Sequence, residues 1–280
     1  MNQPSLSQRL ETHLGPGYQV TGELGHGGFG VVYLVGDKAQ QRYLAVKVIR
    51  QELMDSPTII ERFRREIGYA SKLDHPNIIP VVFSADENDL LYYAMPRARG
   101  KPLSKHLRQR GKLPLDEALN ILLQVAKGLA HAHGRGVIHR DVKPANIMIE
   151  TTGKVSILDF GVAKALSKDG GTLTSSGQLL GSPEYMSPEQ AENVKDLDQR
   201  TDIYSWGVVG YEMLAGRPPF TGKSVPHVLH QHVTEKPAGI RELRPDTPEH
   251  VARVLERCLE KDREKRWQTI EEAARGLEGR

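Results

Sequence analysis

Hydrophobic positions change their spacing once along this chain of 280 residues. In the first third, β-branched and aromatic residues form short runs at 18–24, 33–37, 43–49, 78–83 and 90–95, which predict strands. An amphipathic helix between the third and fourth runs starts at Ser56-Pro57 and carries Phe63 and Ile67 on its apolar face. Beyond residue 103 the spacing becomes helical, most clearly over 115–133. The second part is therefore predicted to be mostly helical.

These patterns divide the chain into parts. Residues 1–17 read as a polar lead-in, 18–95 as a small lobe of five mostly antiparallel strands with one helix, and 101–280 as a larger helical lobe. The stretch 96–100, Pro-Arg-Ala-Arg-Gly, has no apolar pattern and is predicted as the hinge between them. The expected fold class is α+β, with one domain over 18–275.

Composition narrows the function classes. Hydrophobic content is 38% and charged content 26%, as in globular proteins. A net charge of +3 disfavours a dedicated nucleic-acid binder. The lone cysteine excludes a disulfide framework within the chain, and no apolar run reaches the roughly 18 residues of a membrane span. We therefore expect a cytoplasmic protein, with membrane anchoring only if the chain is cut from a longer one.

A charged turn lies between two apolar runs at 137–149. It contains His139, Arg140, Asp141, Lys143 and Asn146. Charge in an apolar setting is costly unless it is paired or binds a ligand. The turn is therefore predicted to hold a reaction centre.

A lysine lies inside the apolar third strand. Lys47 needs an anionic partner there. On the following helix, Glu66 lies about 60° from Phe63, within the apolar sector, whereas Glu61 is on the wet side. We expect Glu66 to pair with Lys47; the alternative is an ordinary surface glutamate.

Glycines 25, 27 and 30 form a G-x-G-x-x-G pattern. Because strand residues follow it instead of a helix, the pattern does not fit a dinucleotide-binding turn. A glycine hairpin can lie over phosphates, since no side chain blocks its amides. A flexible hairpin without a ligand is the alternative.

Two oxygen donors are predicted to share one site. Asp159 follows an apolar strand and precedes a Phe-Gly turn, and it lies thirteen residues after Asn146 of the charged turn. Carboxylate and amide oxygens suit Mg²⁺, which is usually shared with substrate phosphates.

Taken together and in order, these motifs resemble the eukaryotic-type (Hanks-type) protein kinase signature. They are G-x-G-x-x-G-x-V at 25–32, Ala-Val-Lys at 45–47, His-Arg-Asp at 139–141 with Asn146, and Asp-Phe-Gly at 159–161. Lys143 resembles the serine/threonine-specific form, and Ser-Pro-Glu-Gln at 187–190 resembles the bacterial subfamily. The resemblance covers about residues 18–270. It implies a bilobal protein kinase fold that transfers the γ-phosphoryl group of ATP to serine or threonine hydroxyls of proteins.

The resemblance also implies catalytic roles. Lys47, held by Glu66, would grip the α- and β-phosphates. Asp141 would orient the substrate hydroxyl and take its proton, and Lys143 would offset charge on the γ-phosphoryl group. Asn146 and Asp159 would hold Mg²⁺, with Mn²⁺ as a substitute.

The nucleotide contacts implied by the resemblance come from the glycine loop, the third strand and the hinge. Val32, Ala45 and Met148 would sandwich the adenine, with Met95 as gatekeeper. Pro96 replaces the usual acidic residue, but its contact uses a carbonyl, which proline retains. The implied set is Leu24, Gly25, His26, Gly27, Gly28, Phe29, Gly30, Val31, Val32, Ala45, Lys47, Met95, Pro96, Ala98 and Met148.

The segment from 159 to 189 has two interpretations. One is a mobile polar loop. The other, which the resemblance favours, is a phosphorylation switch at Thr174, Ser176 or Thr172, read by Arg140. Protein substrates and self-association for trans-autophosphorylation are the partners it implies.

The resemblance further implies a supporting framework. His139 would pack against Phe160, and Ser182 would face Asp141 and Lys143. Glu189 would pair with Arg266. Asp202 would accept backbone hydrogen bonds from the His-Arg-Asp turn.

Two alternatives stay open at this point. A pseudokinase scaffold would be expected to lose Lys47, Asp141 or Asp159, and all three are present. A small-molecule phosphotransferase of the same fold would be expected to lack the Ser-Pro-Glu segment and the framework of Asp202 and Arg266.

Overall fold

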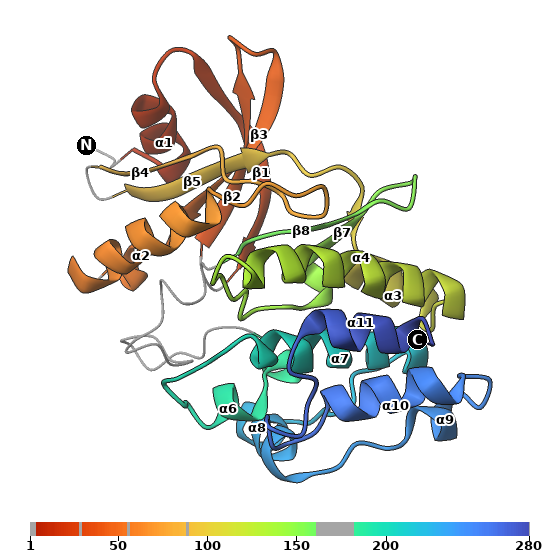
Figure 1. Ribbon diagram of the computed structural model, residues 1–280. Helices are drawn as coiled ribbons and strands as arrows, with labels where there is room; N and C mark the ends of the chain where they lie inside the picture. Colours follow the sequence, from red (N-terminus) through yellow and green to blue (C-terminus); the bar gives the residue numbers. More distant parts are fainter. Residues whose placement is uncertain (1–3, 28–29, 55–56, 88–89, 161–181, 280) are drawn as a thin grey trace.

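Figure 1 shows the computed structural model, which describes residues 4–27, 30–54, 57–87, 90–160 and 182–279. The first part of the chain builds a five-stranded antiparallel sheet in the order β1-β2-β3-β5-β4. A second, three-stranded sheet has the order β6-β7-β8. The strands are β1 (Tyr18–Gly27), β2 (Gly30–Asp37), β3 (Arg42–Ile49), β4 (Phe83–Glu87), β5 (Leu90–Pro96), β6 (Lys101–Pro102), β7 (Ile147–Ile149) and β8 (Val155–Ile157).

Helices dominate the rest of the chain, so the predicted α+β class is confirmed (Figure 1). The predicted helix at 115–133 has the expected bounds. The helices are α1 (Leu6–Leu14), α2 (Pro57–Ala70), α3 (Leu103–Arg110), α4 (Leu115–His133), α6 (Pro188–Ala191), α7 (Arg200–Ala215), α8 (Val225–Thr234), α9 (Ile240–Leu243), α10 (Glu249–Cys258) and α11 (Ile270–Leu277), with short 3-10 turns η1 (Gln51–Leu53), η2 (Pro144–Asn146) and η4 (Pro183–Tyr185).

Strand β3 is buried on both faces of the five-stranded sheet. Successive side chains of a strand point to opposite faces. Ala45 and Ile49 therefore pack with α2, in a cluster that includes Phe63. Val46 and Val48 pack on the opposite face. Lys47 is two residues from Ala45, so its side chain leaves the same face of the sheet and points toward α2.

Helix α1 covers that opposite face, within a stretch for which the sequence had predicted only a polar lead-in. Ser5 and Gln8 form a reciprocal capping box at its start. Leu10 is fully buried in the cluster with Val35 and Val46. A helix this short is marginal alone in water, so packing against the sheet stabilises it.

Replacing Leu10 by alanine should lower the free energy of unfolding by about 2 kcal/mol, the lower end for a buried leucine because a terminal helix can relax. Denaturant unfolding measures the change. Glu11→Ala, on the exposed side of the same helix, is the control. An unchanged unfolding midpoint for Leu10→Ala would show that α1 does not stabilise the sheet.

The fourth strand lies later than predicted. Residues 78–83 were expected to form it, but β4 begins at Phe83. Pro80 has no amide hydrogen to donate to a ladder. The residues before it bond to β8 instead: Ile79 donates to the carbonyl of Ile157 at 2.9 Å, and Ile157 donates to that of Asn77 at 2.8 Å. This segment therefore ties the region before β4 to the second sheet.

Helix α7 forms the centre of the helical part and is buried on nearly all sides. The indole of Trp206 is fully buried and donates to the carbonyl of Leu122 in α4 at 3.0 Å. A side chain at Gly210 would come within 2.7 Å of Leu255, so glycine allows α10 to approach closely. Asp202, in the first turn of α7, is also fully buried.

Candidate active site

Asp202 fixes the backbone of the charged turn. Its Oδ2 accepts from the amide of His139 at 2.8 Å, and its Oδ1 accepts from the amide of Arg140 at 2.7 Å. The Nε2 of His133, at the end of α4, lies 2.8 Å from Oδ2. Burial alone would raise the pKa of Asp202, but the hydrogen bond and charge of His133, with the other partners, hold it below its usual value. The carboxylate therefore holds Arg140 in a left-handed conformation, with φ of 67°.

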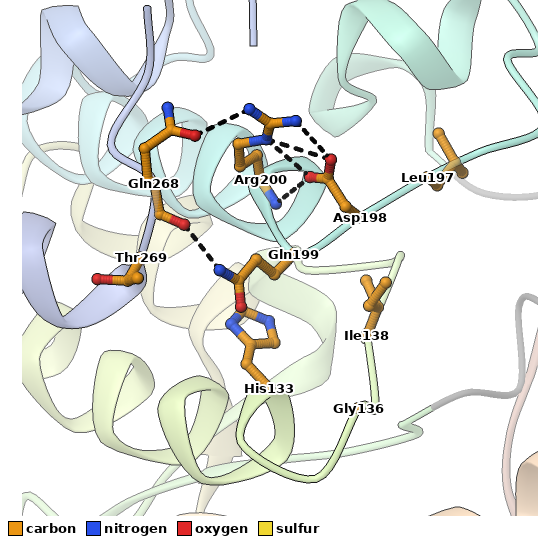
Figure 2. Close-up of a pocket in the computed structure, with 9 residues that line it drawn as sticks. All are labelled: His133, Gly136, Ile138, Leu197, Asp198, Gln199, Arg200, Gln268 and Thr269. Atoms are coloured by element: carbon orange, nitrogen blue, oxygen red, sulfur yellow. Dashed lines mark hydrogen bonds and ion pairs between the residues drawn. The ribbon is translucent and has the colours of Figure 1, made fainter. Parts of the chain in front are cut away.

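His133 also lines a hollow of about 540 Å³ behind this anchor (Figure 2). Its polar side chains bond largely to one another. Arg200 donates to Asp198 at 2.7 Å and to the amide oxygen of Gln268 at 2.8 Å. Gln199 donates to the carbonyl of Gln268 at 2.7 Å. This junction ties the start of α7 to the segment before α11, and so holds Asp202 in place.

His139 orients the turn. Its side chain is buried, with Nε2 donating to the carbonyl of Leu158 at 2.7 Å and Nδ1 accepting from the amide of Asp141 at 3.2 Å. Its ring meets Phe160 edge-on, with centroids 4.6 Å apart. Both ring nitrogens are therefore engaged, and the ring holds the turn against Leu158 and Phe160.

The carboxylate of Asp141 is positioned by two neighbours. Its Oδ2 lies 2.8 Å from Nζ of Lys143 and 3.0 Å from Nδ2 of Asn146. Nδ2 of Asn146 also donates to the backbone carbonyl of Asp141 at 2.9 Å. Among the residues that the structure describes, none donates to Oδ1. That oxygen is therefore available to accept a proton from a bound hydroxyl.

Asp159 is held by the five-stranded sheet. Its Oδ2 accepts from Nζ of Lys47 at 2.6 Å, and its Oδ1 accepts from the hydroxyl of Tyr93 at 2.6 Å. Burial would raise the pKa of Asp159, but the charge and hydrogen bond of Lys47, with that of Tyr93, lower it. The amide of Leu158 donates to the carbonyl of Asn146 at 2.9 Å. This bond places the two predicted oxygen donors on adjoining backbone.

Lys47 and Glu66 both lie where the sequence placed them, facing the interior. Their exposed fractions are 8% and 6%. The ion pair seen for Lys47 is with Asp159, and Glu66 Oε1 lies 3.6 Å from Nη2 of Arg65. The pairing of Lys47 with Glu66 stays a prediction.

Arg140 carries a largely buried cation. Burial lowers its pKa, and the charges of Glu66 and Asp202 partly offset this effect. Within the described ranges, its Nε has no hydrogen-bond partner. The predicted phosphorylation sites Thr172, Thr174 and Ser176 lie outside the described residues, so their pairing with Arg140 stays a prediction.

The predicted adenine contacts come from both sheets. Ala45 and Met95 pair across β3 and β5 and pack in one cluster with Val32. Met148 is half-buried on β7. Pro96 pairs with Leu44 at the end of β5. Contacts of these residues with adenine stay predictions.

The glycine loop is described only in part. Leu24 and His26 are exposed near the end of β1, and Gly28 and Phe29 lie outside the described residues. Gly30 is required by packing, because a Cβ there would come within 2.0 Å of the carbonyl oxygen of Val48. A Cβ at Gly25 or Gly27 would meet no atom within 4 Å. Val31 pairs with Val48 across β2 and β3.

Glu189 and Arg266 are joined as the resemblance implies. Nη1 and Nη2 of Arg266 lie 2.7 and 2.8 Å from the two carboxylate oxygens, and Arg266 is fully buried. Thr201 donates to Oε1 of Glu189 at 2.8 Å. Ser182 precedes η4, and its placement against Asp141 and Lys143 stays a prediction.

The donor set at Asn146 and Asp159 can be tested against a metal. Over the described ranges, no group of three or more His, Cys, Asp or Glu side chains could hold an ion. One carboxylate and one amide oxygen instead fit a hard cation that completes its shell from water and phosphate oxygens, as Mg²⁺ usually does. The residues present therefore fit a cation brought with a nucleotide.

Sequence reasoning missed three residues of this site. Tyr93 had a signal, because a tyrosine in a fully buried strand needs a partner for its hydroxyl. Gln190, whose Nε2 donates to the carbonyl of Arg140 at 2.9 Å, had none. His133, at the end of α4, contacts Asp202 directly and also has no separate signal in the sequence.

Comparison with known proteins identifies similar chains. The family profile described as "Protein kinase domain" matches residues 18–275. The chain is 37% identical to serine/threonine-protein kinase PrkC of Bacillus subtilis over 255 residues, covering 91% of this chain and 39% of that protein. It is 37% identical to serine/threonine-protein kinase PknB of Mycobacterium tuberculosis over 265 residues, covering 93% of this chain and 42% of that protein. It thus spans about two-fifths of these relatives.

Solved structures agree with the architecture. The crystal structure of the Mycobacterium tuberculosis PknI kinase domain superposes with a TM-score of 0.75 at 28% identity, covering 94% of this chain and 96% of that one. In the part of the chain that is described, no helix is both long and apolar enough to span a bilayer.

Proposed function

The chain belongs to the protein kinase family, and from that premise we propose that it is a serine/threonine protein kinase that transfers the γ-phosphoryl group of ATP to protein hydroxyls. The observation that carries the proposal is the carboxylate of Asp141. It is oriented by Lys143 and Asn146 in a turn fixed by Asp202. Its Oδ1, to which no described residue donates, would accept the proton of a substrate hydroxyl. A positioned carboxylate of this kind suits a general base.

Phosphoryl transfer depends mainly on positioning and on neutralising charge. Lys143 lies beside Asp141 and would offset negative charge on the transferred group. Lys47 would leave Asp159 to bind the α- and β-phosphates. The glycine loop between β1 and β2 would cover the triphosphate.

Asn146 and Asp159 would hold Mg²⁺, or Mn²⁺ in its place. Such an ion neutralises charge on the β- and γ-phosphate oxygens when bound. The side chain of Asn146 contributes twice in this proposal, because its Nδ2 orients Asp141 while its amide oxygen is a ligand.

We propose further that autophosphorylation of the segment around Thr172, Thr174 and Ser176 activates the enzyme. The support is Arg140, a largely buried cation whose Nε has no partner among the described residues. A phosphate supplies strong acceptors and about two negative charges. Self-association of two chains would allow one to modify the other.

Incubation with γ-labelled ATP, with and without a basic acceptor protein, tests both proposals. We expect label on the acceptor, and on the chain within residues 172–176. Asp159→Asn should abolish both signals, and Asp246→Asn, at an exposed position, should leave them unchanged. Label on neither protein would refute the kinase proposal. A fully active chain with an unmodified 172–176 peptide would refute the switch.

A further inference from the structure

The sheet presents two hydrogen-bond donors to Asp159 from neighbouring strands. Lys47 on β3 and Tyr93 on β5 are directly paired in the antiparallel register, so their side chains leave the same face of the sheet. They reach different oxygens of one carboxylate, Nζ to Oδ2 and the hydroxyl to Oδ1, each at 2.6 Å. The cross-strand pair therefore grips the carboxylate from two sides.

Tyr93 is the more rigid of the two donors. Its ring is 1% exposed and packs against Phe63 of α2, with centroids 6.2 Å apart. A tyrosine ring has two side-chain torsions, whereas the longer lysine chain has four. Lys47 can therefore change partner while the packed phenol remains in place.

Little room is left for a substitute donor. A cavity of about 10 Å³ lies beside Tyr93, Asp159 and Phe160. This volume is at the lower limit for a single water molecule. If the hydroxyl were removed, Oδ1 would lose a donor that the packed ring holds in place, and a water in the vacated space would not be held in the same way.

We propose that Tyr93 is a positioning residue for the metal-binding carboxylate. It fixes Oδ1 of Asp159 and leaves Oδ2 free to exchange Lys47 for a divalent cation. This inference rests on the proposed function. A neutral phenol suits the task, because it orients the carboxylate without cancelling the negative charge that attracts the cation.

The test is the Tyr93→Phe variant, in which only the hydroxyl is lost. Mn²⁺ binding is followed by electron paramagnetic resonance in the presence of a non-hydrolysable ATP analogue. We expect the affinity for Mn²⁺ to fall about 10- to 100-fold, as when an outer-shell partner of a metal ligand is removed. In the transfer assay, the Mg²⁺ concentration for half-maximal rate should rise by a similar factor, with kcat near the wild-type value at saturating Mg²⁺.

The neighbouring tyrosine provides a matched control. Tyr92 is 5% exposed and packs on the opposite face of the sheet, so Tyr92→Phe should leave Mn²⁺ affinity unchanged. Replacing Tyr93 by p-aminophenylalanine keeps a donor on the same ring and should restore most of the affinity. That variant also carries the test if Tyr93→Phe does not fold, which thermal unfolding would reveal.

The outcomes separate this inference from the proposed function. If the wild-type chain binds Mn²⁺ with the nucleotide but Tyr93→Phe binds it equally well, the role of Tyr93 is refuted. Equal losses in the Tyr92 and Tyr93 variants would refute it too, since they would indicate a general packing effect. If the wild-type chain does not bind Mn²⁺ with the nucleotide, the proposed function fails, and this inference fails with it.

Discussion

Replacing Asp141 by asparagine should lower kcat by about 10²- to 10⁴-fold, the range expected for loss of a general base. The substitution preserves shape, and an amide oxygen can still accept from Lys143, which now lies 2.8 Å from Oδ2 of Asp141. What is lost is the ability to take a proton from the acceptor hydroxyl. Because Asp141 makes no proposed contact with ATP, nucleotide affinity should stay close to the wild-type value.

Single-turnover kinetics and nucleotide-binding titrations separate the two quantities. Asp246→Asn repeats the chemical change at a carboxylate that is 68% exposed and paired with Arg244, and should leave both unchanged. Near-normal turnover by Asp141→Asn would refute the role given to this residue. A parallel loss of ATP affinity would instead indicate a disordered turn.

Replacing Arg266 by methionine should destabilise the chain by about 3–5 kcal/mol, the usual cost of breaking one side of a buried ion pair. Arg266 is fully buried and bonds to both oxygens of Glu189. It also donates to the carbonyls of Glu260, Lys261 and Arg200, at 2.8, 3.0 and 3.2 Å. The variant would leave the carboxylate of Glu189 without its cation.

At acid pH, the difference in unfolding free energy between the wild-type protein and Arg266→Met should become smaller. Burial alone would raise the pKa of Glu189, but the hydrogen bonds and charge of Arg266 lower it below its usual value. A carboxyl with a lowered folded-state pKa adds stability above its unfolded pKa, and this is lost as pH falls through the folded pKa. In Arg266→Met the folded-state pKa of Glu189 should rise, because its cation is gone. At acid pH, protonation of Glu189 then removes the unpaired charge in the variant, whereas in the wild-type protein it breaks the ion pair.

Urea unfolding at neutral and acid pH measures both effects. Arg241→Met, on an exposed position of α9, should change the free energy of unfolding by no more than about 0.5 kcal/mol. The double variant Glu189→Gln with Arg266→Met should recover part of the loss at neutral pH. If Arg266→Met loses the same unfolding free energy at both pH values, the unpaired charge on Glu189 is not the cause of the loss.

Much of the architecture was predictable, because strand and helix spacings differ clearly along this chain. The bounds of α4 were predictable for that reason. Helix α1 was not, since its few leucines lie among polar residues and its stability comes from packing on the sheet. The start of β4 was misplaced because the bonds of residues 77–79 go to β8, a partner that local sequence does not reveal.

In the candidate site too, local features were predictable from the sequence and long-range contacts were not. Motif order was sufficient to group Asp141, Lys143 and Asn146, which lie within one turn. The contact of Lys47 with Asp159 was harder to predict, because it joins a strand to a distant turn and depends on the left-handed backbone of Asp159, with φ of 64°. Tyr93 was missed for the same reason: its contact is set by two strands and a distant turn.

The two acids of the site, Asp141 and Asp159, are held by different parts of the fold. Asp141 belongs to a turn whose backbone is hydrogen-bonded to Asp202 in the buried helix α7. The carboxylate of Asp159 accepts hydrogen bonds from Tyr93 and Lys47 of the sheet. The backbone next to Asp159 is bonded to Asn146, whereas its carboxylate is bonded to the sheet. A shift of the sheet against the helices should therefore turn this side chain, and a pair of spectroscopic labels placed on β5 and α7 would measure such a shift.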